Sequence, residues 1–267
     1  MVCSMVNQVT SLYRVESKFG DDIFARNAYE KSVHRHLKCG TTFAAYFATL
    51  HLPASKILVD VIKKLGQRAF VGKVNMDRNS PDYYVEETTK GCDDAEEFIR
   101  HVLKLSPSGQ TLLDAVDGEQ QLHEDTMNAL PSTGYFEARY SLLNKADTPV
   151  VMPIVTPRFV PTCTGEMMTK LGFLSYKYGV PVQSHLSENL GEISWVKELH
   201  PECDTYADVY KKYHLLHSAT LMGHCCFSSR NERGVIKQQN AAVVHCASSN
   251  FNLNSGKGMN DTDNAMI

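Results

Sequence analysis

The chain has 267 residues, which is long enough to bury a full-sized core in one or two domains. Its formal net charge of −3 gives no electrostatic attraction to nucleic acid or to an anionic membrane, and no apolar run approaches the length of a membrane span. The N-terminus lacks the features of a signal peptide and the eight cysteines form no C-x-x-C pair, so we expect reduced thiols in a cytoplasmic protein.

Helical and strand patterns alternate through the first part of the chain. Some segments carry apolar residues at helical spacing, and others are short runs rich in β-branched and aromatic residues. The expected elements, in order, are a helix over 21–38, a strand over 41–49, a helix over 55–65, a strand over 68–76 and a helix over 93–105. Such alternation with short connections is typical of parallel β/α units.

Residues 106–147 interrupt this alternation. The segment contains several Gly, Pro, Ser and Asp residues and shows weak periodicity, so we expect an irregular insertion that is helical near residues 112–127.

The alternation resumes after the insertion. The expected elements are a strand over 150–155, a helix over 165–178, a strand over 180–184, a helix over 193–199, a helix or turn over 206–213, a strand over 220–223, a helix over 231–239 and a strand over 241–245. We expect one domain over residues 1–256 and a disordered polar tail over 257–267.

Polar residues follow several successive strands of the expected sheet. They are Arg158, His185 with Glu188, His224, and His245 with Asn250. The carboxyl ends of barrel strands converge on one face, whereas in an open sheet they would be spread along an edge. No glycine-rich phosphate loop follows any strand, which also argues against a dinucleotide-binding sheet. The fold class that we predict is α/β, as part of a (β/α)8 TIM-type barrel.

The stretch Val180–Asn189 carries the most specific chemistry of this set. His185 ends a strand and can offer a neutral ring nitrogen to a divalent metal, with zinc or iron as the candidates, and Glu188 can serve as a proton shuttle. The alternative interpretation is a helix N-cap formed by Ser184 or Ser187, with an acidic residue in the first helical turn.

Two other patterns resemble metal sites less closely. His34 and His36 have the spacing of a ligand pair, but residues two apart on a helix point to different faces, so we expect both to be solvated. Cys225 and Cys226 are adjacent, and we interpret them as small, partly buried thiols.

In six stretches that include the strand-end residues Arg158, His185, Glu188 and His224, the chain resembles the guanine deaminases of the amidohydrolase superfamily, which are metal-dependent hydrolases. The matching stretches cover most of residues 20–256 and follow the order of the family. They are C-G-T-T-F-A-A-Y-F-A-T-L-H (39–51), G-Q-R-A-F-V-G-K-V-N-M-D (66–77), P-I-V-T-P-R-F (153–159), Q-S-H-L-S-E-N (183–189), M-G-H-C (222–225) and V-H-C-A-S-S-N (244–250).

The resemblance implies a role for each matched residue. His185 resembles the metal ligand of the fifth barrel strand, and Glu188 resembles the carboxylate that moves protons between the metal-bound water and the purine. Arg158 and Phe159 resemble residues that hold the purine, and His185 and Glu188 also face it. His224 resembles the catalytic histidine near the metal water.

The resemblance further implies an activity, a cofactor and an assembly. The activity is the hydrolytic deamination of guanine to xanthine and ammonia in purine catabolism, with zinc as the cofactor and guanine as the substrate. The complete protein is expected to be a homodimer. For His245 we expect a structural role.

The sequence also departs from the family pattern. Family members carry H-x-H in a first strand and an aspartate in a G-T-D context in an eighth strand. Here His34 and His36 align with the helix after the first strand, and Asp261 and Asp263 stand in a different context. With His185 as the one matched ligand, we expect about strands two to seven of the barrel, an incomplete zinc site, and an isolated chain that is poorly stable and inactive.

Two alternatives to a guanine deaminase stay open. One is a non-catalytic, truncated isoform of the same lineage. The other is a related amidohydrolase that acts on another base.

Overall fold

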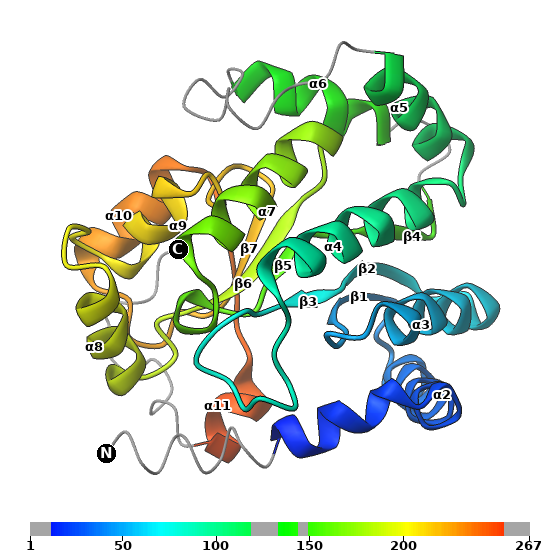
Figure 1. Ribbon diagram of the computed structural model, residues 1–267, viewed down its shortest axis with the longest axis horizontal. Helices are drawn as coiled ribbons and strands as arrows, with labels where there is room; N and C mark the ends of the chain where they lie inside the picture. The colour runs from blue at the N-terminus through cyan, green and yellow to red at the C-terminus, as the bar shows by residue number, and fades with distance from the viewer. Residues whose placement is uncertain (1–11, 119–132, 144–148, 254–267) are drawn as a thin grey trace.

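The computed structural model describes residues 12–118, 133–143 and 149–253, and of residues 133–135, 252 and 253 only the backbone (Figure 1). The fold is a mixed α/β arrangement in which parallel strands form the interior and helices cover them from outside.

The strands pair in chain order, and the pairings described below are all parallel. The first sheet has the order β1 (Phe43–Phe47), β2 (Arg68–Gly72) and β4 (Val151–Pro153), and a short pair joins β3 (Val74–Asn75) to β5 (Thr156–Pro157). The third sheet has the order β6 (Val182–Leu186), β7 (Thr220–His224) and β8 (Ala242–Val244). A parallel bridge between Val155 and Val182 connects the first two groups to the third. The strand order therefore places β5, β6 and β7 next to one another.

The seam between β2 and the β4–β5 connection requires a glycine. A Cβ atom on Gly72 would lie 1.7 Å from Thr156 Oγ1 and 2.5 Å from the carbonyl oxygen of Ile154. Only a residue without a side chain allows the two backbones to approach this closely.

Seven of the helices lie where the sequence pattern predicted them and in the same order. They are α2 (Asp22–Lys38), α3 (Leu52–Leu65), α4 (Thr88–Leu103), α7 (Gly165–Tyr178), α8 (Leu190–Leu199), α9 (Tyr206–Lys212) and α10 (Arg230–Gln238). Gly66 and Gly179 end α3 and α7 in the left-handed conformation, as expected from their positions in the sequence. A capping box between Thr205 and Asp208 begins α9.

Two stretches contain more helix than their sequences predicted. The helix expected near 112–127 begins earlier as α5 (Pro107–Gly118), and a second helix, α6 (Thr133–Leu143), follows in the same insertion. Both pack against other helices: α5 contacts α4 and α7, and α6 contacts α7. The residues after β8 form α11 (Ala247–Leu253), a stretch for which the sequence pattern predicted no helix. The tail 257–267 lies outside the described residues.

Three hydrophobic clusters fill the interior. One lies between α4, α5, α7, α8, α9 and the strands β6 and β7, and the second lies between α2, α3 and the strands β1, β2 and β4. The third is small and consists of Tyr13, Leu50, Val74, Met76 and Tyr84. This last cluster anchors the N-terminal end of the described chain above the ends of β1 and β3.

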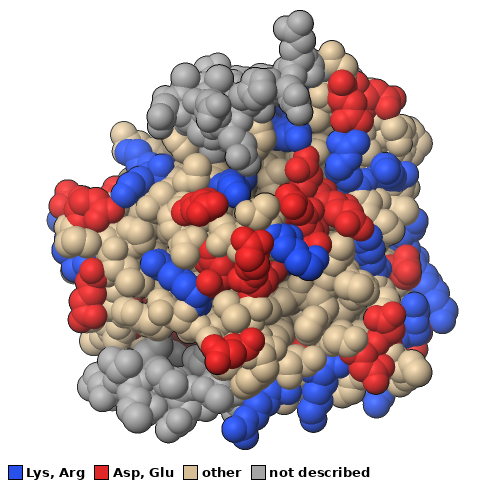
Figure 2. Space-filling view, viewed as in Figure 1, with Lys and Arg blue, Asp and Glu red and all other residues tan. Residues whose placement is uncertain are grey.

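The surface is charged and mixed. On the face shown in Figure 2, acidic and basic side chains are interspersed, as the small net charge would suggest. None of the helices in the described ranges combines the length and apolarity that crossing a membrane would require.

Candidate active site

The carboxyl ends of β5, β6 and β7 bring four of the predicted residues close together. In the register of β6 and β7, Leu186 stands opposite His224, and the rings of His185 and His224 stack with their centroids 5.2 Å apart. Glu188 Oε1 lies 3.6 Å from His224 Nδ1, and the main chain of Arg158 contacts His185 directly. We call Arg158, His185, Glu188 and His224 the strand-end cluster.

His185 is neutral and holds a defined tautomer. Its Nδ1 lies 2.7 Å from the carbonyl oxygen of Arg158, which can only accept, so Nδ1 carries the proton and Nε2 carries the lone pair. Burial, and to a smaller extent the neighbouring His224, together lower the pKa of His185 to about 3. The Phe47 ring packs against the imidazole at 4.5 Å between centroids. His185 therefore has the protonation state of a metal ligand.

The ring of His224 is held by Asn250, one of the polar residues that the sequence places after the last expected strand. Its Nδ1 lies 2.6 Å from Oδ1 of Asn250 in α11. An amide oxygen can only accept, so Nδ1 of His224 is the donor. His224 and Cys225 both adopt left-handed backbone conformations, with φ of 70° and 52°. Non-glycine residues in this region are strained, and such strain concentrates at functional sites.

The loop that carries Glu188 is fixed by two buried carboxyls. Ser187, with φ of 48°, donates from its hydroxyl to Glu232 Oε2 at 2.8 Å, and the amide of Glu188 donates to Glu192 Oε2 at 3.2 Å. Burial raises the pKa of Glu192 to about 8, and the nearby charge of Glu188 adds to this effect. Glu192 is therefore protonated at neutral pH and holds the backbone of the proposed proton shuttle.

The alternative interpretation of Val180–Asn189 as a helix cap named the wrong residues, Ser184 and Ser187. Asn189 is the N-cap of α8, because its side chain accepts from the amide of Glu192 at 2.9 Å. Ser184 donates instead to the carbonyl of Pro157 at 2.8 Å, and Ser187 is engaged with Glu232. The cap thus lies one residue after Glu188, whose carboxylate faces His224 in the cluster.

Arg158 makes an ion pair that no sequence pattern predicted. Its Nη1 and Nη2 donate to the two carboxylate oxygens of Glu16 at 2.6 and 3.0 Å, and the Tyr13 ring lies 4.8 Å from the guanidinium carbon. Burial alone would lower the pKa of Arg158, but the hydrogen bonds and charge of Glu16 raise it above its ordinary value. Phe159, the next residue, is partly exposed and extended, with φ of −173°.

The remaining candidates lie outside this cluster. His245 is exposed at the end of β8, and His34 is exposed on α2. The prediction that His36 is solvated is wrong, because its Nδ1 lies 2.9 Å from the Tyr46 hydroxyl. The cysteines in the described ranges are free thiols, and Cys226 accepts a hydrogen bond from Asn250.

The described residues do not fit a complete zinc site. His185 presents an Nε2 lone pair and the His224 ring stacks beside it, but no group of three or more His, Cys, Asp or Glu side chains within 12–118, 133–143 and 149–253 is arranged to hold a metal ion. A catalytic zinc takes three protein ligands and keeps a fourth position open. The structure therefore supports two histidine donors and no more from these ranges.

Comparison with known proteins identifies the class. The model of the amidohydrolase family matches residues 4–260, and the chain belongs to this family.

Its relatives within the family are more specific. The chain is 42% identical over 244 residues to the guanine deaminase of Dictyostelium discoideum, which covers 91% of this chain and 45% of the relative. It is 35% identical to the guanine deaminase of Homo sapiens, again with 91% and 45% coverage. The chain thus spans less than half the length of these curated relatives.

Solved structures agree. A guanine deaminase from C. acetobutylicum with guanine bound in its active site is 40% identical, with a TM-score of 0.71 over 91% of this chain and 48% of that one. A triazine hydrolase from Arthobacter aurescens, 14% identical with a TM-score of 0.65 over 97% of this chain and 50% of that one, shares the fold.

Proposed function

We propose that the chain acts in the hydrolytic deamination of guanine to xanthine and ammonia. The observation that supports this most strongly is the strand-end cluster itself. It brings an arginine, two histidines whose Nδ1 atoms face oxygen acceptors, and a carboxylate to adjacent strand ends, in a chain related to guanine deaminases along most of its length. Purine catabolism in the cytoplasm is the setting that we propose, and a homodimer is the proposed assembly of the complete protein.

Arg158 and Phe159 are the proposed base-binding residues. A guanidinium presents several N–H donors in one plane, which suits the acceptor-rich edge of a planar base better than the point charge of a lysine would. The partly exposed ring of Phe159 follows directly and offers an apolar surface beside it. The partly buried ring of His185 would form the floor of the same pocket.

Glu188 is the proposed proton shuttle. In hydrolysis a water oxygen bonds to the ring carbon that bears the amino group, and the bond from that carbon to the amine breaks. Glu188 would accept a proton from the attacking water, pass it to the adjacent ring nitrogen, and later deliver a proton to the departing amine. His224, held by Asn250, would orient the water from the other side.

No step is assigned to a metal ion. The family resemblance implies zinc, and an atrazine chlorohydrolase of similar fold is complexed with zinc, but the described residues supply only two suitable donors. We further propose that β1 to β8, with β2 continued by β3 and β4 continued by β5, correspond to about strands two to seven of an eight-stranded barrel within a domain over 1–256. The resemblance and the chain-order pairing support this assignment.

The test combines binding with turnover. The purified chain, supplied with zinc, is titrated with guanine, adenine and cytosine and assayed for xanthine formation. Glu188→Gln is compared with Glu198→Gln, which changes an exposed carboxylate on the neighbouring helix α8. We expect guanine to bind best, and Glu188→Gln to lower whatever turnover the chain supports by about 10²- to 10⁴-fold, while Glu198→Gln has no effect.

The three hypotheses give different results in this experiment. Binding of guanine without turnover would favour the non-catalytic alternative and would agree with the expectation of an inactive isolated chain. A preference for adenine or cytosine would favour an amidohydrolase acting on another base.

A further inference from the structure

The guanidinium of Arg158 is held by a segment that lies far away in sequence. Glu16 binds both terminal nitrogens from one side, and the Tyr13 ring lies against the guanidinium at 4.8 Å. The residues are 142 positions apart, so folding of the interior must bring this contact together.

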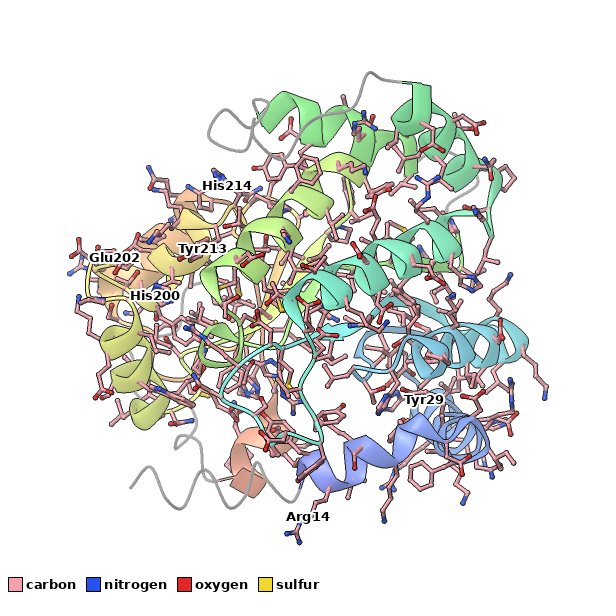
Figure 3. The ribbon with its side chains drawn as sticks, in the orientation of Figure 1. Arg14, Tyr29, His200, Glu202, Tyr213 and His214 are labelled. Carbon is pink, nitrogen blue, oxygen red and sulfur yellow. The ribbon has the colours of Figure 1, made fainter. Side chains whose placement is uncertain are left out.

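The segment is anchored for this purpose. Tyr13 and Glu16 are three residues apart in helical chain, so they share one face, whereas Arg14 and Val15 are exposed. Arg14, labelled in Figure 3, points away from the body of the molecule. Tyr13 is 3% exposed and packs on Tyr84 with ring centroids 5.5 Å apart.

The backbone of Arg158 is fixed independently of its side chain. Its amide donates to the carbonyl of Asn75 at 3.0 Å, and its own carbonyl accepts from His185 Nδ1. A guanidinium carries five N–H donors, and Glu16 accepts two of them, which leaves three for a ligand. The arginine is therefore preorganised at both ends, with donors to spare.

The pair also sets the charge of the pocket. The Glu16 carboxylate cancels the Arg158 cation at close range. The carboxylate of Glu188 then leaves the cluster with an excess of negative charge. An anionic ligand would meet no unpaired cation among these residues and would be repelled by Glu188. A neutral base carries no net charge, so its binding does not depend on an unpaired cation.

We propose that Glu16 is a positioning and specificity-determining residue for this site. It holds the Arg158 guanidinium in place and neutralises it, so that the strand-end cluster binds a neutral purine base in preference to an anionic one. This inference rests on the proposed function, because it concerns the ligand preference of the same pocket.

The experiment compares a neutral and an anionic purine. Dissociation constants for guanine and for urate, which is an anion at neutral pH, are measured by titration calorimetry. The variants are Glu16→Gln, which removes the charge and keeps the shape, and Glu16→Asp, which keeps the charge. The control is Asp117→Asn, because Asp117 makes the same two-bond pair with Arg100 on the outer helices α4 and α5.

The ratio of the two affinities is the readout. We expect Glu16→Gln to weaken guanine binding and to strengthen urate binding, each roughly tenfold, because a hydrogen bond to a charged group is worth a factor of this size. Glu16→Asp should keep most of the wild-type ratio, and Asp117→Asn all of it. A purely structural role for Glu16 would weaken both ligands equally.

Two results would overturn the proposal. One is an unchanged guanine-to-urate ratio in Glu16→Gln with the fold confirmed by circular dichroism. The other is urate binding that stays undetectable in every variant. A wild-type chain that binds no guanine, beside a Glu16→Gln variant that gains urate binding, would instead reject the proposed function and retain the charge assignment.

Discussion

Two arginines of this molecule make the same two-bond pair with a carboxylate in very different surroundings. Arg158 and Glu16 meet at the strand ends, where their side chains are 16% and 25% exposed. Arg100 and Asp117 meet on the outer helix pair, α4 and α5, where the corresponding values are 31% and 54%. The bond lengths are similar, from 2.6 to 3.0 Å in the first pair and 2.8 to 2.9 Å in the second.

The difference between the two regions lies in what surrounds the charges. In the outer pair, water screens both groups and replaces the partner at little cost. At the strand ends, removal of one partner leaves the other partly desolvated and without compensation. We therefore expect that removing a partner costs more free energy of unfolding at the strand ends than on the outer helices, although the two pairs have the same geometry. Matched substitutions in the two regions measure this difference.

The largest difference is expected from glycine substitutions. Gly72→Ala places a Cβ atom 1.7 Å from Thr156 Oγ1 in the seam beneath the cluster, whereas Gly118→Ala meets nothing within 4 Å at the end of α5. Urea unfolding should show a loss of about 3 kcal/mol or more for Gly72→Ala, at the upper end of overpacking effects. Gly118→Ala should change the free energy of unfolding by less than about 1 kcal/mol. Similar values for the two variants would show that the seam can relax.

The arginines themselves come next. Arg158→Met should lower the free energy of unfolding by about 2–3 kcal/mol, somewhat less than for fully buried pairs because Glu16 is partly exposed. Arg100→Met should cost less than about 1 kcal/mol. Chemical denaturation of both variants at one pH provides the measurement, and equal losses would contradict the role that we give to burial.

The carboxyls of the two regions should respond to pH in opposite directions. Burial raises the pKa of Glu192 to about 8 from an unfolded value near 4.5, whereas hydrogen bonds from Arg100 lower the pKa of Asp117. Between pH 4.5 and 8, Glu192 has lost its proton in the unfolded chain but keeps it in the folded protein. The contribution of Glu192 to stability is therefore full below pH 4.5 and is lost as the pH rises towards 8.

Glu192→Gln isolates this contribution. The free energy of unfolding of the wild type, relative to this variant, should fall by about 1 kcal/mol per pH unit between pH 5 and 8. Tyr206 and Glu188 act on the same carboxyl and remain in both proteins. Parallel pH profiles for the two proteins would show that Glu192 is ionised in the folded state.

The smallest difference concerns helix caps. Asn189→Ala removes the cap of α8 next to Glu188, and Glu87→Ala removes the cap of the outer helix α4. Thermal unfolding should report a loss of about 1 kcal/mol for Asn189→Ala and a smaller loss for the exposed Glu87. A larger loss for Glu87→Ala would reverse the comparison.

The sequence predicted the residues of the strand-end cluster better than the residues that hold them in place, Glu16 and Asn250. Arg158, His185 and His224 could be placed together because each follows a strand, and parallel strands end at a common edge. Glu16 could not be predicted, since it lies in a short segment without strong periodicity and pairs across most of the chain. Asn250 was noted as a strand-end residue, but its position on α11 depends on the tertiary packing around His224.

Burial explains the other differences between prediction and structure. Glu192 looks like an ordinary first-turn acid in the sequence, and only the packing of α8 shows that it is enclosed and protonated. The helices α5 and α6 replace most of the expected irregular chain because they find partners on α4 and α7. Contacts of this kind leave no local pattern in the sequence.

The central claim is that guanine binds at the strand-end cluster through Arg158. Calorimetric titration of guanine into the wild type and into Arg158→Lys tests it directly, because lysine keeps the charge opposite Glu16 but loses the planar set of donors. We predict saturable binding to the wild type and an affinity at least about tenfold lower for the variant. Equal affinities, or no binding of guanine to a folded wild type, would contradict the claim.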